Sequence, residues 1–170
     1  MAVEPPLSRI VLNATSVADD LGFVALSDLA AVVGAEGATH RVIGGHMVTA
    51  LVARWGLGAA LYRETGDSDL GVPPVAITGT DLLGRLRGLG YEQTAGNRFA
   101  REVTDVPLRL EGADAKERRA VIDVLIPAYT SRARQNRRVG EDLVTTEVPG
   151  LALALKRAAV DLDLELGVLT

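Results

Sequence analysis

Residues 40–55 have the sequence HRVIGGHMVTALVARW, and the fold prediction starts from them. The pattern predicts a short strand at His40 to Ile43, a turn at Gly44 and Gly45, and a helix at His46 to Trp55. The helix would carry its apolar residues on one face, at Val48, Leu51, Val52 and Trp55. Because glycine has no Cβ, a phosphate could approach both the backbone of the turn and the first N–H groups of the helix.

Two aspartates follow in the stretch Arg63-Glu64-Thr65-Gly66-Asp67-Ser68-Asp69. We expect a strand within Thr65 to Val75, on which side chains two residues apart point to the same face with Cα atoms about 7 Å apart. Like charges at that separation repel unless a positive group lies between them. Magnesium prefers oxygen ligands and keeps positions for water and phosphates, so Asp67 and Asp69 are candidate metal ligands.

A third carboxylate, Asp123, interrupts the apolar run Ala120 to Pro127, which predicts a strand. An ionised group in such a run is costly unless it is paired or bound to a metal ion. Three carboxylates from two strands can hold two metal ions for an in-line displacement at phosphorus. The alternative is a structural ion pair between Asp123 and a neighbouring arginine such as Arg63.

Taken singly these motifs are common, but their order is more specific. A strand, a Gly-Gly turn, a helix, an Arg-x-Thr-x-Asp-x-Asp segment and a lone aspartate resemble the nucleotidyltransferase superfamily related to DNA polymerase beta. The Arg-x-Thr-x-Asp-x-Asp form resembles the AbiE-type nucleotidyltransferase toxins of bacterial toxin-antitoxin and abortive-infection systems. The matching stretch runs from about His40 to Ile126, about half of the chain. The resemblance implies an α/β (α+β) fold, with a nucleotidyltransferase-like mixed β-sheet and flanking helices, in a single domain over residues 1–170.

The resemblance also implies roles for individual residues. The catalytic carboxylates, which would bind two Mg²⁺ ions, are Asp67, Asp69 and Asp123. The groups that would position the triphosphate of the nucleotide are Gly44, Gly45, Arg63 and Thr65. The implied reaction transfers a nucleoside monophosphate from an NTP to an acceptor hydroxyl, with RNA or tRNA as acceptor. A toxin of this kind would act in the cytoplasm and have a cognate antitoxin as partner.

Outside the motifs, the first 25 residues carry no clean period, although Ile10 to Leu12 could form a strand. We expect helices from Ser27 to Gly34 and after Thr80. The remaining segments predict strands at Tyr91 to Thr94, Phe99 to Val103, Val106 to Leu110, Val144 to Leu155 and Val160 to Leu166. Lys156 and Arg157 would then form a turn.

One departure from the family concerns the end of the chain. The toxins generally continue into a helical part that carries a further lysine and aspartate, whereas this chain ends in a predicted strand. We therefore expect the helical part to be absent, and Lys156 not to match its lysine. This keeps two other functions open: a catalytically inactive binding or interaction module, and a metal-independent small-molecule binding domain whose carboxylates pair with arginines.

Composition narrows the classes of partner. With 18 basic and 22 acidic residues the net charge is −4, so attraction to nucleic acid would need a local patch. The candidate patch consists of Arg132, Arg134, Arg137 and Arg138, which could equally be a solvated basic face.

The absence of cysteine excludes disulfides and thiolate metal sites and is typical of a reducing, cytoplasmic environment. No apolar run reaches the roughly 18 residues of a membrane span. His46 could touch a phosphate or be structural, and with His40 alone it gives no zinc site.

Overall fold

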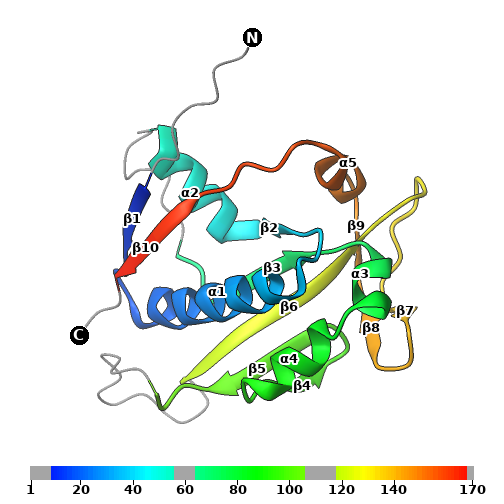
Figure 1. Ribbon diagram of the computed structural model, residues 1–170, viewed down its shortest axis with the longest axis horizontal. Coiled ribbons are helices and arrows are strands. Elements are labelled where there is room, and N and C mark those ends of the chain that lie inside the picture. The colour runs from blue at the N-terminus through cyan, green and yellow to red at the C-terminus, as the bar shows by residue number, and fades with distance from the viewer. Residues whose placement is uncertain (1–8, 56–63, 106–117, 168–170) are drawn as a thin grey trace.

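The computed structural model describes residues 9–55, 64–105 and 118–167. A mixed six-stranded sheet is flanked by helices, which confirms the α+β class (Figure 1). Its strand order is β2-β3-β6-β5-β4, and β9 pairs with β6. The β3–β6 and β6–β9 pairs are parallel and the others antiparallel. The bounds are β2 Arg41–Ile43, β3 Asp67–Gly71, β4 Glu92–Ala95, β5 Arg98–Glu102, β6 Arg119–Pro127 and β9 Glu147–Val148.

The longest helix, α1 (Val17–Glu36), packs against β3 and β6 (Figure 1). Its N-cap is Ser16, whose hydroxyl accepts a hydrogen bond from the backbone N–H of Asp19, and it ends at Gly37 with φ 59°. The prediction that this helix starts at Ser27 is wrong by ten residues. Its first half is buried on all sides from Asp19 to Leu26, so it shows no alternation of polar and apolar faces.

The strand and helix predicted from residues 40–55 are confirmed as β2 and α2 (Gly44–Trp55), but the helix is rotated relative to the expectation. The prediction of a separate turn is wrong, because Gly44 and Gly45 are the first two residues of α2; the name Gly-Gly turn is kept for this pair. The buried residues of α2 are His46, Thr49 and Ala50. Three of the apolar side chains expected to face the core, Val48, Leu51 and Trp55, are instead exposed, with Trp55 at 69% exposure, and Val52 is half-buried.

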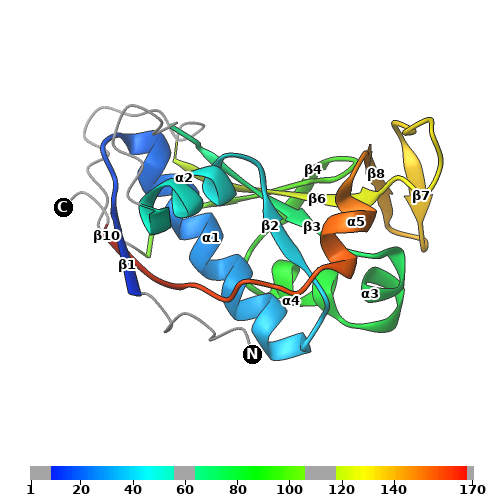
Figure 2. The same cartoon turned by 90° about the horizontal axis from the view of Figure 1, so that it is seen from above.

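Beyond β3 the chain forms α3 (Pro74–Gly79), which was not predicted, and α4 (Leu82–Gly88), which was. The core under α1 and α4 includes fully buried Leu29, Leu86, Tyr91, Phe99 and Ile122. A separate parallel pair, β1 (Arg9–Asn13) and β10 (Asp163–Gly167), packs on Phe23 as a second cluster. These two strands lie side by side at one end of the molecule (Figure 2).

The prediction of a strand from Val144 to Leu155 is wrong. That segment contains β8 (Leu143–Thr145), which pairs with β7 (Arg137–Val139), then β9 and a helix, α5 (Leu151–Lys156). A left-handed Gly150, φ 80°, starts the helix, and its Leu and Ala residues are strong helix formers. Lys156 therefore ends a helix rather than forming a turn.

Arg41 forms hydrogen bonds with the C-terminal end of α5. Its guanidinium donates to the carbonyl oxygens of Ala154 (3.1 Å) and Arg157 (2.5 Å), which are the unpaired acceptors at a helix C-terminus. The predicted strand Val106 to Leu110 lies outside the described residues. Within the described ranges no helix is long and apolar enough to cross a membrane.

Candidate functional site

Three carboxylates meet at neighbouring strands. Asp67 and Asp69 lie on β3 on either side of Ser68, whose side chain points the other way and donates to the carbonyl oxygen of Gly22. The parallel register sets the Cα of Asp69 opposite that of Asp123 on β6. The two strands thus bring together all three predicted catalytic residues, and we call this group the carboxylate cluster: Asp67, Asp69 and Asp123.

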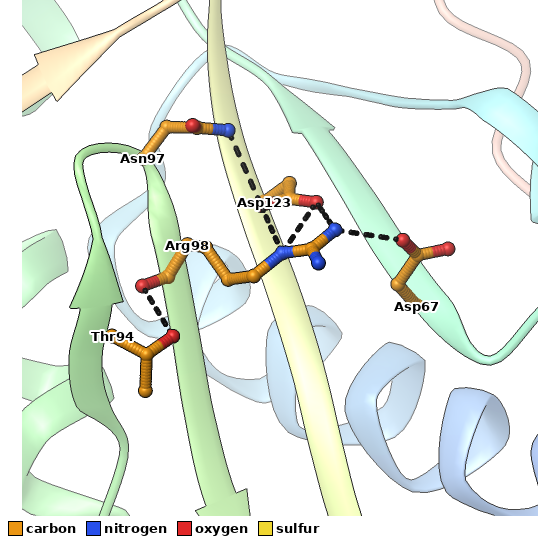
Figure 3. Close-up of polar contacts among 5 residues, drawn as sticks. All are labelled: Asp67, Thr94, Asn97, Arg98 and Asp123. Carbon is orange, nitrogen blue, oxygen red and sulfur yellow. Dashed lines mark hydrogen bonds and ion pairs between the residues drawn. The ribbon is translucent and has the colours of Figure 1, made fainter.

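An arginine that the sequence did not single out reaches into this cluster. Arg98 begins β5 and faces Asp123 in the antiparallel register of β5 and β6. Its Nη2 donates to Asp123 Oδ2 at 2.6 Å and to Asp67 Oδ2 at 3.2 Å, and its Nε donates to Asp123 Oδ1 at 3.1 Å. Figure 3 shows the guanidinium between the two aspartates. The structural ion pair considered for Asp123 is therefore made, but with Arg98.

Asn97 completes the contacts of Asp123. Its side-chain Nδ2 donates to Asp123 Oδ1 at 3.2 Å (Figure 3). The backbone N–H of Val124 donates to the carbonyl oxygen of Asn97. Asp123 is consequently nearly buried, with 11% of its side chain exposed, and both of its oxygens accept hydrogen bonds.

The electrostatics of the cluster single out Asp69. Burial is the largest cause that raises the pKa of its carboxyl, and together with the negative charges of Asp67 and Asp123 it brings the pKa from 3.8 to about 6, against the opposing effect of Arg98. A carboxylate held in such repulsion is typical of a functional site, because it destabilises the fold unless a cation binds it.

The Gly-Gly turn lies directly against the cluster. Gly44, with φ 69°, follows Ile43, whose Cα is opposite Asp69 in the antiparallel β2–β3 pair. A Cβ on Gly44 would lie 2.0 Å from Asp69 Oδ2, and a Cβ on Gly45 would lie 1.9 Å from Thr65 Oγ1. Only glycine permits this close approach, and the turn brings the N-terminus of α2 beside the carboxylates.

Of the remaining predicted site residues, some lie next to the carboxylate cluster and others do not. Thr65 packs on the turn as described, and Arg63 lies outside the described residues. His46 is buried beneath the turn, its ring centroid 5.9 Å from that of Phe23, and burial lowers its pKa. Its Nε2 makes no hydrogen bond within the described part of the chain. His46 thus packs inside, and His40 contacts the carbonyl oxygen of Ala38.

The basic stretch leads into the β7–β8 hairpin, and two of its arginines, Arg137 and Arg138, lie on β7. All four arginines are exposed, and the hairpin packs on the β4–β5 turn. Gln93 Nε2 donates to the carbonyl oxygens of Gly96 and Asp142, and a Cβ on Gly96 would lie 2.5 Å from the carbonyl oxygen of Val144. This turn also carries Asn97 and leads into Arg98.

The donor set of the cluster fits a hard divalent cation, because it consists of carboxylate oxygens with unbalanced negative charge. As they lie, however, no three acidic or histidine side chains of the described ranges are arranged to hold a metal ion. A positive charge does lie between Asp67 and Asp123, but it belongs to Arg98.

Comparison with protein-family models, with curated proteins and with solved structures finds no match to this chain.

Proposed function

We propose that the protein is a nucleotidyltransferase that transfers a nucleoside monophosphate from a magnesium-bound NTP to an acceptor hydroxyl. The observation that carries the proposal is the carboxylate cluster beside the Gly-Gly turn. Asp69 lies opposite Asp123 on parallel strands, and both glycines are packed so closely on Asp69 and Thr65 that no larger residue fits. A like-charge pair of one buried and one half-buried carboxylate is costly for stability, and a bound cation and polyphosphate would offset the cost.

In this reaction the acceptor oxygen attacks the α-phosphorus of the NTP. The bond from that phosphorus to the bridging oxygen breaks, pyrophosphate leaves, and the hydroxyl proton passes to Asp123, which orients the hydroxyl. Bound magnesium would neutralise charge on the phosphates and align the attacking and leaving oxygens. Asp67 and Asp69 would hold the metal ions with Asp123, and the N–H groups at the start of α2 would face the triphosphate.

RNA is the acceptor class that the surface favours. Four exposed arginines lead into or lie on the β7–β8 hairpin, which packs on the turn that precedes Arg98: Arg132, Arg134, Arg137 and Arg138. Arginine clusters of this kind bind phosphate backbones by charge and by paired hydrogen bonds. That the RNA is tRNA, and that the enzyme is a cytoplasmic toxin with a cognate antitoxin, rests on the resemblance to AbiE-type toxins.

A second function, a catalytically inactive module that binds another molecule, is favoured by one specific observation. Arg98 already neutralises part of the cluster, so the fold does not require a metal ion there. In such a protein the carboxylates and Arg98 would be a permanent ion-pair network, and the exposed apolar face of α2 would be open to a partner.

Thermal unfolding with ATP, GTP, CTP and UTP, each with and without magnesium, separates the two functions. A ligand at 100 times its Kd stabilises by about 2.7 kcal/mol, which moves the midpoint by several degrees. We expect at least one NTP to raise the midpoint only with magnesium, and an Asp67→Asn, Asp69→Asn double variant to lose the effect. That NTP, labelled at its α-phosphate, should then label RNA.

The matched control is Asp161→Asn, Asp163→Asn. These residues form another Asp-x-Asp, both exposed and remote in sequence from the cluster, and their replacement removes the same charge. The control variant should keep the magnesium-dependent shift. If no NTP stabilises the wild-type protein under any condition, the enzyme proposal is rejected and the inactive module is favoured.

A further inference from the structure

We propose that Arg98 is the internal cation of the carboxylate cluster. In this proposal it competes with a divalent cation for Asp67 and Asp123, and it moves to a phosphate group when metal and nucleotide bind. The proposal rests on the metal binding of the proposed function, but only the last step requires a nucleotide.

The first argument is that Arg98 uses the oxygens a metal ion would need. Asp123 Oδ1 accepts from Arg98 Nε and Asn97 Nδ2, and Asp123 Oδ2 accepts from Arg98 Nη2 at 2.6 Å. The same Nη2 contacts Asp67 Oδ2. A magnesium ligand must approach the ion to about 2.1 Å with a lone pair directed at it. The guanidinium and the ion therefore exclude each other from the space between the two aspartates.

The second argument is charge. Three ionised carboxylates face one guanidinium, so Arg98 leaves the cluster with excess negative charge. Arg98 bonds to Asp67 and Asp123, while Asp69 lies opposite Asp123 across the parallel strands and adds its charge to the same face. A divalent cation brings twice the charge of a guanidinium in a smaller volume, so exchanging one for the other relieves more of the repulsion.

The third argument is that Arg98 is free to leave. Its side chain is 47% exposed and lies at the first residue of β5, beside the hairpin turn, so withdrawal opens no hole in the core. Arg101, on the same strand, is the opposite case. It is nearly buried and donates to both Asp28 and Asp105. A released guanidinium pairs best with a planar or tetrahedral oxyanion, and the phosphates of a nucleotide bound at the cluster would supply one.

The test measures binding of Mn²⁺ alone by isothermal titration calorimetry on wild-type protein, Arg98→Gln and Arg87→Gln. Arg87 pairs with exposed Asp142 on the surface, and its replacement removes the same charge without touching the cluster. We expect Arg98→Gln to bind Mn²⁺ at least tenfold more tightly than wild type, and Arg87→Gln to match wild type. Equal or weaker binding by Arg98→Gln overturns the proposal.

A second measurement uses only the wild-type chain. The NMR signal of the Arg98 Nε–H group should shift when Mg²⁺ is added, because the bond to Asp123 is lost. It should shift again when a non-hydrolysable NTP is added with Mg²⁺. The Nε–H of Arg101, bonded to Asp28 at 2.8 Å, serves as internal control and should not move. An Arg98 signal unchanged at saturating Mg²⁺ overturns the competition, and one unchanged by the nucleotide overturns the transfer to phosphate.

The two proposals fail in different ways. If Arg98→Gln binds Mn²⁺ more tightly but no NTP stabilises the protein, the competition stands and the nucleotidyltransferase function fails. If magnesium and an NTP stabilise the protein but Arg98→Gln shows no gain in Mn²⁺ affinity, the function stands and the role of Arg98 fails.

Discussion

Asp69 lies directly opposite Asp123 across two parallel strands, so their carboxylates share one face of the sheet. Like charges in such a pair are destabilising. Arg98 bonds to Asp123 and Asp67, and its charge offsets only part of the raised pKa of Asp69. The strain of the cluster is therefore concentrated on Asp69, and removing that one charge should stabilise the protein.

The first prediction is that Asp69→Asn stabilises the metal-free protein at neutral pH and not in acid. Because the pKa of Asp69 is raised from 3.8 to about 6, the folded protein keeps a proton on this carboxyl at pH values where the unfolded chain has lost it. At a pH well below 3.8 the Asp69 carboxyl is protonated in both the folded and the unfolded chain, so it does not reduce the free energy of unfolding. As the pH rises from about 4 to 6, the free energy of unfolding of the wild-type protein falls. A shift of this size corresponds to at most about 3 kcal/mol, and we expect about half because the carboxyl is partly open to solvent.

Denaturant unfolding in EDTA at pH 4.0 and pH 7.5 checks this difference. Asp161→Asn, which removes an exposed carboxylate, should change the free energy of unfolding by less than about 0.5 kcal/mol at both pH values. A stability difference for Asp69→Asn that is the same at both pH values would show that its carboxyl titrates normally.

The second prediction concerns the turn. Gly45→Ala should lower the free energy of unfolding by about 1–3 kcal/mol, because the added methyl group would lie 1.9 Å from Thr65 Oγ1 and 2.9 Å from its Cβ. It should also abolish magnesium-dependent stabilisation by NTP, since the turn must move. Gly34→Ala is the control: Gly34 lies exposed within α1 with nothing within 4 Å, so alanine should stabilise by about 0.5–1 kcal/mol. Equal stability of Gly45→Ala and wild type would contradict the packing.

The sequence predicts the parts of the site that follow from local periods. The alternation of Asp67, Ser68 and Asp69 defines one face of a strand, and a lone carboxylate in an apolar run marks Asp123. Arg98 could not be found in this way. The contact between Arg98 and Asp123, which are 25 residues apart along the chain, depends on the register between β5 and β6. No local sequence pattern specifies that register.

The incorrect helix predictions have a common physical cause. A segment that is buried on all sides shows no helical alternation of polar and apolar residues, so the sequence pattern does not predict the start of α1, where Asp19 and Asp20 are buried among apolar residues. The run Leu151 to Leu155 is apolar throughout and fits a strand as well as the helix α5. In α5 the decision comes from tertiary contacts. Leu151 packs on Gly71, where a Cβ would lie 2.6 Å from its Cδ1, and Arg41 bonds the final carbonyl groups.

The third prediction tests the orientation of α2. If the helix is buried through His46, Thr49 and Ala50, replacing Trp55 by Gln should cost less than about 1 kcal/mol. Leu29→Ala, at a fully buried position in α1, should cost about 2–5 kcal/mol by chemical denaturation. A comparable loss from both variants would show that Trp55 is covered.

The fourth prediction separates stability from site chemistry. Asp28 accepts hydrogen bonds from Tyr91 Oη at 2.9 Å and Arg101 Nε at 2.8 Å, and burial next to this charge raises the pKa of Tyr91. Asp28→Asn should destabilise by about 2–4 kcal/mol, because among the described residues it leaves the nearly buried Arg101 with only the exposed Asp105 as counter-charge.

The matched control, Asp105→Asn, breaks the exposed half of the same network and should cost less than about 1 kcal/mol. In neither variant should the magnesium-dependent rise in midpoint that the proposed function predicts change, since both residues bond to Arg101 and contact none of the carboxylate cluster within the described chain. If Asp28→Asn removed the NTP effect while the protein stayed folded, the network around Arg101 would be coupled to the site through β5, whose first residue is Arg98.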